Sequence, residues 1–356
     1  MDGGGIRGLI TLGYLKQIEA ILRERTGGGK AFRLRDHYDL IGGTSTGSII
    51  AAGLAIGLGV DELIEQYLAL GESIFGKATL VGGMTSGALA PKFEAAAVDR
   101  VLETVLGERT LGSDDITTGL CIVTKRFDTN SVWPIVNAPD SKYYEHATQP
   151  NKAFVLRRIV RASTAAPTYF DPEFITLGPQ TYGFIDGGIS MHNNPALQLL
   201  LVATLPNFGF RWPTGADKLS ILSIGTGDWP RAVPLSSWQP GSVPLKQVGN
   251  LIGMLMEDAS ALDETVLQAI GVGRNRREID RVTGAMDGSL WGESRLSYER
   301  YQVDLTEPFF KDLGLGPEYV SRIDGYRQMD NIKYMADLLH IGAVASQAQL
   351  QPSDVL

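Results

Sequence analysis

One serine in this sequence stands in a context that favours nucleophilic chemistry. Ser45 is the middle residue of the Gly-Thr-Ser-Thr-Gly run at 43–47, which follows an apolar run at 38–42 and precedes a helix-forming run at 48–55. A Gly-x-Ser-x-Gly turn between a strand and a helix exposes the serine hydroxyl above the sheet, because its glycines leave room for strained backbone angles. Ser45 is therefore a candidate nucleophile. The alternative is a plain turn in which Thr44 or Ser45 caps the helix.

The first residues of the chain could supply an oxyanion hole for such a serine. Asp-Gly-Gly-Gly-Ile-Arg-Gly at 2–8 is followed by apolar residues at helical spacing. Glycines at a helix start leave backbone N–H groups bare, and the positive end of the helix dipole lies behind them. Gly3, Gly4 and Gly5 are thus candidate donors to a developing oxyanion, although a phosphate would suit the same groups.

A carboxylate at the end of a later strand is the candidate base. Tyr-Gly-Phe-Ile at 182–185 reads as a strand that runs into Asp186, Gly187 and Gly188. The alternative for Asp186 is a local Asx turn, which is common before two glycines.

Taken in order, these segments resemble the patatin-like phospholipases. Two further segments support the resemblance, Ala-Ser-Thr-Ala-Ala-Pro-Thr-Tyr-Phe at 162–170 and Ser-Ile-Gly-Thr-Gly at 223–227, and the best-matched part of the chain is 2–230. The resemblance implies a lipid acyl hydrolase, a phospholipase A-type serine hydrolase that cleaves fatty-acyl ester bonds. It also implies a catalytic dyad, with Ser45 as nucleophile and Asp186 as base, and an oxyanion hole at Gly3, Gly4 and Gly5.

Arginines offer candidate sites for an anionic headgroup. In related phospholipases an arginine at the place of Arg7 is associated with the substrate headgroup, and the alternative is an exposed arginine paired with a carboxylate. Two further groups, at 157–161 and 274–277, concentrate positive charge. For both groups the alternative is an ordinary helix face that is exposed to solvent and binds no lipid.

A histidine could replace the aspartate as the base, since histidine is the usual base at neutral pH. The sequence has four histidines, and only His192 lies near the motif residues. An aspartate can serve instead when it is partly desolvated and bonded directly to the serine. We therefore expect a dyad and keep a triad with His192 as the alternative.

Two other classes of function remain as alternatives. Glycine-rich loops also bind phosphates, so the chain could be a phosphate- or nucleotide-binding protein, but the loop at 2–8 lacks the Gly-Lys-Ser/Thr ending of a P-loop. A noncatalytic patatin-like scaffold would be expected to lack a motif residue, whereas Ser45, Asp186 and the three glycines are present.

Composition limits the partners of the chain. The formal net charge of −8 argues against binding to a nucleic-acid polymer, and the single cysteine, Cys121, excludes a disulfide within the chain. Neither a metal site nor a cofactor is expected from residue spacing. The absence of a long apolar run and of a signal-like start predicts a cytoplasmic protein. The resemblance to the patatin-like phospholipases implies a phospholipid or other acyl-ester lipid as substrate and leaves room for transient, peripheral contact with a membrane surface.

The sequence predicts an α/β fold of the patatin-like three-layer kind, with a mostly parallel central sheet flanked by helices. We expect one domain over 1–356, with 231–356 part of it. Members of the family carry an apolar strand just ahead of the glycine-rich loop, and here Met1-Asp2 stands at that place. The expected strands are 38–42, 118–124, 182–185, 218–224 and 299–304, and the expected helices are 7–24, 46–57, 61–70, 151–163, 194–203, 246–270 and 331–346.

The segment 71–91 mixes glycines with apolar side chains and could act as a lid over an acyl pocket, with a packed loop as the alternative. The resemblance also leaves room for an unidentified activator, since some bacterial relatives are switched on by partners.

Overall fold

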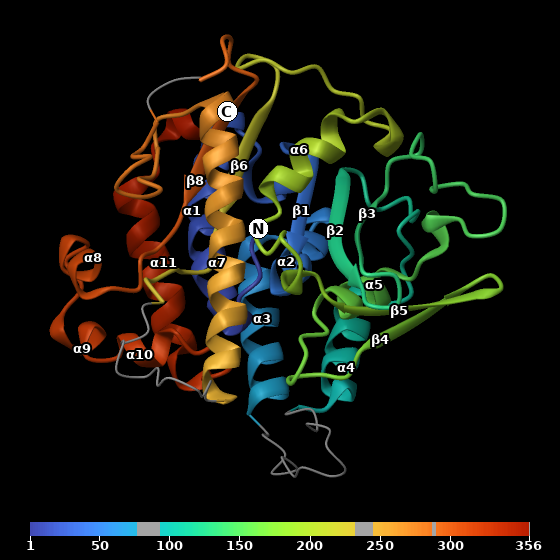
Figure 1. Cartoon of the computed structure of the whole chain (residues 1–356), viewed down its shortest axis with the longest axis horizontal. Coiled ribbons are helices and arrows are strands. Elements are labelled where there is room, and N and C mark those ends of the chain that lie inside the picture. Colours follow the sequence, from blue (N-terminus) through green and yellow to red (C-terminus); the bar gives the residue numbers. More distant parts are fainter. Residues whose placement is uncertain (77–92, 232–244, 287–289, 356) are drawn as a thin grey trace, which may run out of the picture.

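The computed structural model describes residues 1–76, 93–231, 245–286 and 290–355, which form two sheets with helices packed around them (Figure 1). The α/β class expected from the sequence is therefore confirmed, with helices flanking the sheets. The strands are β1 (Leu40–Thr44), β2 (Gly119–Arg126), β3 (Ser131–Val136), β4 (Glu173–Leu177), β5 (Gln180–Asp186), β6 (Ser220–Ile224), β7 (Gly271–Val272) and β8 (Leu296–Tyr301). The helices are α1 (Gly8–Thr26), α2 (Thr46–Ala55), α3 (Val60–Phe75), α4 (Ala95–Leu106), α5 (Leu156–Ser163), α6 (Ala196–Thr204), α7 (Leu245–Ile270), α8 (Glu307–Asp312), α9 (Pro317–Val320), α10 (Ile323–Tyr326) and α11 (Met335–Gln349).

The prediction of a mostly parallel central sheet is wrong, because the larger sheet is mixed. In it β1 runs parallel to β2, whereas β3 and β5 run antiparallel to β2, and β4 runs antiparallel to β5. The smaller sheet, in the order β6, β8, β7, is parallel.

Two hairpins that the sequence analysis did not predict account for the antiparallel strands. Residues 127–130 connect β2 to β3, and Gly178 with Pro179 connects β4 to β5. Connections this short can join only antiparallel neighbours, since a parallel pair needs a crossover of about a dozen residues or more. Asn130 and Gly178 have positive φ angles of 53° and 59°, as such tight turns require. Pro134 lies inside β3, and a proline weakens the strand pattern because it cannot donate a ladder hydrogen bond.

One edge of β2 carries two different strands placed end to end. Pairing with β3 occupies one edge of β2, from Cys121 to Arg126. The other edge pairs with β1 up to Val123, opposite Thr44, and then with β5 from Thr124, opposite Asp186. The carboxyl ends of β1 and β5 therefore meet at the middle of β2, although the two strands run in opposite directions.

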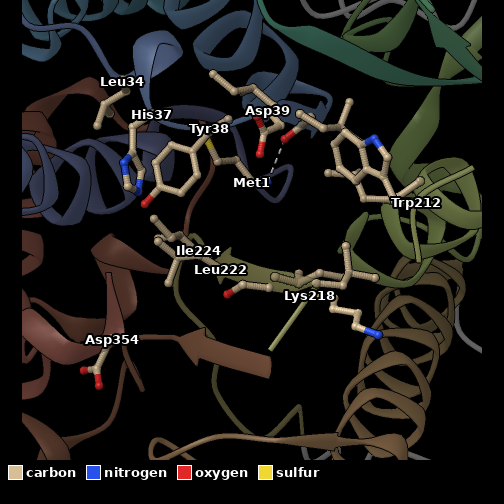
Figure 2. Close-up of a pocket in the computed structure, with 18 of the residues that line it drawn as sticks. Met1, Leu34, His37, Tyr38, Asp39, Trp212, Lys218, Leu222, Ile224 and Asp354 are labelled. Atoms are coloured by element: carbon tan, nitrogen blue, oxygen red, sulfur yellow. Dashed lines mark hydrogen bonds between the residues drawn. The ribbon is translucent and has the colours of Figure 1, made fainter. Parts of the chain in front are cut away.

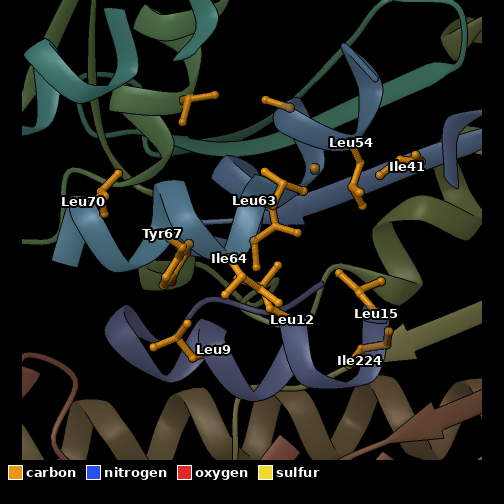
Figure 3. Packing of buried hydrophobic residues seen from close by; sticks show 14 of the residues in the cluster. Leu9, Leu12, Leu15, Ile41, Leu54, Leu63, Ile64, Tyr67, Leu70 and Ile224 are labelled. Carbon is orange, nitrogen blue, oxygen red and sulfur yellow. The ribbon is translucent and has the colours of Figure 1, made fainter. Parts of the chain in front are cut away.

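Helices cover both faces of the sheets. The largest buried cluster joins α1, α2, α3, α5 and α11 to β1 and β2 and takes in residues from Ile6 to Val355. In Figure 3, α1 directs Leu9, Leu12 and Leu15 towards the side chains of α3 and towards Ile41 and Ile224 of the strands. Two smaller clusters pack α6 against β2 and β3, and α6 with α7 against β6 and β8. Cys121 is buried in one of them, as a core thiol.

The first residues of the chain lie between the two sheets. The Met1 amino group donates to the Gly42 carbonyl of β1 at 2.9 Å, and the Asp2 N–H donates to the Ile224 carbonyl of β6 at 3.2 Å. Beside them a cavity of about 660 Å³ separates β1 from β6, with Tyr38 and Trp212 among its lining residues (Figure 2).

The predicted element boundaries agree with the structure to within a few residues for α1, α2, α6 and β6, whereas α4 and α8 to α10 were not predicted. None of the described helices is long and apolar enough to cross a membrane. Residues 77–91 of the expected lid lie outside the described residues, and its start, at 71–75, is the last turn of α3.

Candidate active site

Ser45 occupies a strained turn between β1 and α2. Its backbone angles, φ 53° and ψ −127°, are rare for a residue with a side chain and lift that side chain out of the line of the strand. The Ser45 N–H donates to Ser163 Oγ at 2.9 Å, and the Ser163 hydroxyl donates to the Val123 carbonyl at 2.7 Å. Ser163 at the end of α5 therefore ties the turn to β2, which helps to hold a strained conformation in place.

The Asp186 carboxylate accepts the Ser45 hydroxyl directly. Ser45 Oγ lies 2.6 Å from Asp186 Oδ2, and the Gly188 N–H donates to Asp186 Oδ1 at 2.7 Å. Asp186 is buried, and burial raises the pKa of its carboxyl group to about 6, although both hydrogen bonds act to lower it. A carboxylate with a raised pKa is a better proton acceptor than a fully solvated carboxylate. The hydrogen bond also holds Asp186 Oδ2 next to Ser45 Oγ, the atom that would lose its proton.

The glycine-rich loop lies against this pair. A Cβ atom built on Gly3 would stand 2.8 Å from Ser45 Cβ and 2.6 Å from Asn193 Oδ1, so only glycine fits at this position. Gly5 has a φ of 61°, and a Cβ there would stand 2.2 Å from the Met329 carbonyl oxygen. Gly3 thus lets the backbone pass close to Ser45, and Gly5 lets it pass close to Met329 with a positive φ angle.

Three side chains hold the carbonyl groups of the loop. The Thr226 hydroxyl donates to the Gly3 carbonyl at 2.8 Å, Arg7 Nε to the Gly4 carbonyl at 3.3 Å, and the Tyr67 hydroxyl to the Gly5 carbonyl at 2.6 Å. The three carbonyls are thereby fixed, which fixes the peptide planes that carry the neighbouring amides.

The amides of the loop differ in their partners. The Gly4 N–H donates to Thr46 Oγ1 at 3.2 Å, and the Gly3 N–H donates to the Asn193 carbonyl at 3.2 Å. Within the described residues the Gly5 N–H has no acceptor. The Gly4 bond ties the loop to Thr46, the first residue of α2, directly after Ser45.

Arg7 is buried with its guanidinium turned into the protein. Besides its bond to Gly4, it donates from Nη1 to the Gly227 carbonyl at 3.0 Å and lies 4.9 Å from the ring of Trp229. Burial lowers the pKa of the Arg7 guanidinium to about 10. In this arrangement Arg7 supports the glycine-rich loop, and the exposed, carboxylate-paired alternative does not apply. Its role towards a substrate headgroup stays a prediction.

The arginines of the two other groups make bonds within the protein, while the side chains of Arg158 and Arg274 stay partly exposed. Arg161 is 1% exposed and donates from Nη2 to the Asp171 carbonyl at 3.0 Å. Arg157 pairs with Glu108 at 2.7 Å. In the second group Arg274 pairs with Asp354, and Arg276 and Arg277 bond to carbonyl groups and carboxylates.

His192 lies near the pair without bonding to it. The His192 carbonyl accepts the Thr44 hydroxyl at 2.6 Å, and burial lowers the pKa of the imidazole. Within the described part of the chain, His192 Nδ1 has no hydrogen-bond partner. Among the described residues, Ser45 Oγ therefore has Asp186 rather than His192 as its hydrogen-bond partner.

Sequence reasoning missed several residues that shape the site. Ser163 and Thr226 lie in segments that were noticed, but no role was assigned to either. Tyr67 belongs to the apolar face of α3, and its contact with Gly5 spans 62 residues of sequence, so no local pattern marks it.

Comparisons with known proteins point to one family. A family model described as patatin-like phospholipase matches residues 1–200. Patatin-like protein 1 of Arabidopsis thaliana is 28% identical over 253 residues, which cover 65% of this chain and 58% of that protein. Patatin-17 of Solanum cardiophyllum is 29% identical over 244 residues, which cover 64% of this chain and 59% of the relative. Patatin-1-Kuras 2 of Solanum tuberosum is 30% identical over 244 residues, which cover 64% of this chain and 61% of that relative.

The chain thus spans about 60% of the length of the curated relatives it matches. Among solved structures, VipD from Legionella pneumophila matches with a TM-score of 0.33 and 12% sequence identity. The match covers 95% of this chain and 66% of the VipD chain. A likeness at that score adds nothing to the argument.

Proposed function

Since this chain belongs to the patatin-like phospholipase family, we propose that it is a lipid acyl hydrolase whose catalytic dyad is Ser45 and Asp186. The observation that carries the proposal is the 2.6 Å contact between Ser45 Oγ and Asp186 Oδ2, made by a serine in a strained strand-to-helix turn. A hydroxyl bonded to a buried carboxylate loses its proton to that carboxylate as it attacks.

The proposed reaction has two halves. Ser45 Oγ attacks the carbonyl carbon of the fatty-acyl ester while its proton passes to Asp186 Oδ2. The tetrahedral oxyanion then collapses, the proton passes from Asp186 to the leaving alkoxide, and the acyl group stays on Ser45. In the second half, water gives a proton to Asp186 and attacks the acyl carbonyl. The second tetrahedral oxyanion then collapses, the fatty acid leaves, and the proton returns from Asp186 to Ser45 Oγ, which restores both the hydroxyl and the carboxylate.

The oxyanion is proposed to bind the amides of the loop Gly3–Gly5 and the N-terminus of α2. The Gly5 N–H, which has no acceptor among the residues that the structure describes, supports this role. Thr46 Oγ1 would release the Gly4 N–H when the stronger, charged acceptor forms. A single donor of this kind typically contributes about 3 kcal/mol to transition-state stabilisation, so the hole can compensate for an aspartate acting without a histidine.

The proposed substrate is a phospholipid or another acyl-ester lipid at a membrane surface. Incubating phosphatidylcholine and phosphatidylglycerol vesicles with the wild type and with Ser45→Ala, then measuring lipids by mass spectrometry, tests it. We expect free fatty acid and lysolipid from the wild type alone. If neither lipid class is hydrolysed, and a soluble short-chain ester is not hydrolysed either, the proposal is refuted.

A further inference from the structure

A buried ion pair lies next to the glycine-rich loop, and one of its partners comes from outside the part of the chain that the family model matches. Arg300 on β8 is 1% exposed, and Asp2 is 4% exposed. The guanidinium donates from Nη1 to Asp2 Oδ1 at 2.9 Å and from Nη2 to Asp2 Oδ2 at 2.5 Å. Two parallel bonds between a planar guanidinium and a carboxylate fix orientation as well as distance.

Arg300 is itself held by the smaller sheet and α7. Its Nη1 donates to Ser223 Oγ at 2.8 Å, and Ser223 stands opposite Arg300 in the β6–β8 pairing. Arg300 Nε lies 3.3 Å from Glu264 Oε1 on α7. Both terminal nitrogens of Arg300 donate hydrogen bonds, while its Nε lies beside the Glu264 carboxylate without a hydrogen-bond partner among the described residues. The two terminal nitrogens therefore hold the Arg300 side chain as a rigid anchor rather than a mobile surface charge.

Asp2 passes this constraint directly to the loop. Asp2 precedes Gly3, whose N–H donates to the Asn193 carbonyl at 3.2 Å and whose Cα faces Ser45 so closely that a Cβ would stand 2.8 Å from Ser45 Cβ. A shift of Asp2 would therefore change the position of Gly3 relative to Ser45. The amides of Gly4 and Gly5, which follow Gly3 in the chain, would shift as well.

We propose that Arg300 is a positioning residue for the oxyanion loop, acting through the Asp2 carboxylate; this inference rests on the ester hydrolysis proposed above. Arg300 touches neither Ser45 nor Asp186. Arg300 instead positions the backbone amides of the loop, which stabilise the transition state rather than bind the substrate. Loss of Arg300 therefore lowers kcat and leaves KM nearly unchanged.

The test compares Arg300→Met and Arg300→Lys with Arg274→Met. Arg274 also places a guanidinium on a carboxylate, that of Asp354, with Nε 2.9 Å from Oδ1, but it has no contact with the loop. The measurements are kcat and KM on a soluble short-chain ester, together with hydrogen exchange of the backbone amides of residues 3–8, which needs no activity.

We expect Arg300→Met to lower kcat by roughly 10- to 100-fold, as a small displacement of catalytic groups does, with KM within about twofold. Exchange at residues 3–8 should become faster. Arg300→Lys keeps the charge without the two-pronged contact and should fall between the wild type and Arg300→Met, whereas Arg274→Met should change neither kcat nor exchange at residues 3–8.

An unchanged kcat, a kcat loss equal to that of Arg274→Met, or unchanged exchange at residues 3–8 would overturn the inference. If Arg300→Met does not fold, Arg300→Lys decides by the same measurements. If the wild type hydrolyses no ester, the proposed function fails, and hydrogen exchange alone then decides whether Arg300 positions the loop.

Discussion

Ser45 Oγ lies 2.6 Å from Asp186 Oδ2 across 141 residues of sequence, because the strands that deliver the two residues end at adjacent places on one edge of β2. β1 reaches Val123 from one direction, and β5 reaches Thr124 from the other. The contact therefore depends on the antiparallel β5 and would not arise at this point in a purely parallel sheet.

The direct contact predicts that Asp186, rather than a histidine, is the base. Asp186→Asn keeps the shape of the side chain but removes the proton acceptor, so kcat/KM on a soluble ester should fall by about 10³-fold or more. His192→Ala should stay within about threefold of the wild type, because His192 makes no hydrogen bond to the pair. A loss in His192→Ala as deep as that in Asp186→Asn would indicate a triad.

The raised pKa of Asp186 predicts how activity depends on pH. The carboxyl group accepts a proton only when it is ionised, and its pKa of about 6 lies above the ordinary value of 3.8. Hence kcat/KM should rise with pH, gain about tenfold per pH unit below pH 6, and level off above it. The measurement is kcat/KM of a soluble ester from pH 4.5 to 8.5. A profile already level at pH 5 would mean that Asp186 is not the titrating base.

The close approach of Gly3 to Ser45 predicts that a single methyl group disrupts the site. In Gly3→Ala the new Cβ would meet Ser45 Cβ and Asn193 Oδ1, and the loop must move away. We expect kcat to fall by at least about 10²-fold, as for loss of an oxyanion donor, with the circular dichroism spectrum unchanged. Gly59→Ala is the matched control, since its Cβ meets nothing closer than 3.4 Å. Equal activity of the two variants would contradict the assigned role of the loop.

The Tyr67 hydroxyl is predicted to support the oxyanion loop from α3. Tyr67→Phe keeps the ring but leaves the Gly5 carbonyl without its 2.6 Å donor, so kcat should fall about tenfold while KM stays constant. The free energy of unfolding should drop by about 1–2 kcal/mol. Tyr14→Phe removes an equally short bond, to Gln349, away from the site. Urea unfolding measures the free energy of unfolding of both variants, and ester kinetics measure their kcat and KM. An equal loss of kcat in Tyr14→Phe would refute a specific role of Tyr67 in supporting the loop.

Local patterns were enough to find the elements that carry the chemistry. The turn at 43–47 and the Asp-Gly-Gly at 186–188 are short motifs whose conformation is decided by glycines and neighbouring strands, and the structure brings Ser45, Asp186 and Gly3 together. The same reasoning missed β3 and β4, because Pro134 interrupts the pattern of one strand and the other lies in a tight hairpin.

Long-range contacts could not be predicted in the same way. Arg300 joins Asp2 across 298 residues, and Tyr67 joins Gly5 across 62. An arginine in a strand and a tyrosine on an apolar helix face carry no local signal of such partners, which depend on how β8 and α3 pack beside the loop.

The most direct test of the central claim is covalent labelling of the nucleophile. A fluorophosphonate reacts with a serine activated as Ser45 is proposed to be, and peptide mass spectrometry identifies the labelled residue. Ser48 is the internal control, since its hydroxyl donates to the Ser45 carbonyl and has no carboxylate partner in the part of the chain that the structure describes. We expect the label on Ser45 and none on Ser48, with no labelling of Ser45→Ala and much slower labelling of Asp186→Asn. Labelling of Ser45→Ala at the wild-type rate would contradict the proposed mechanism.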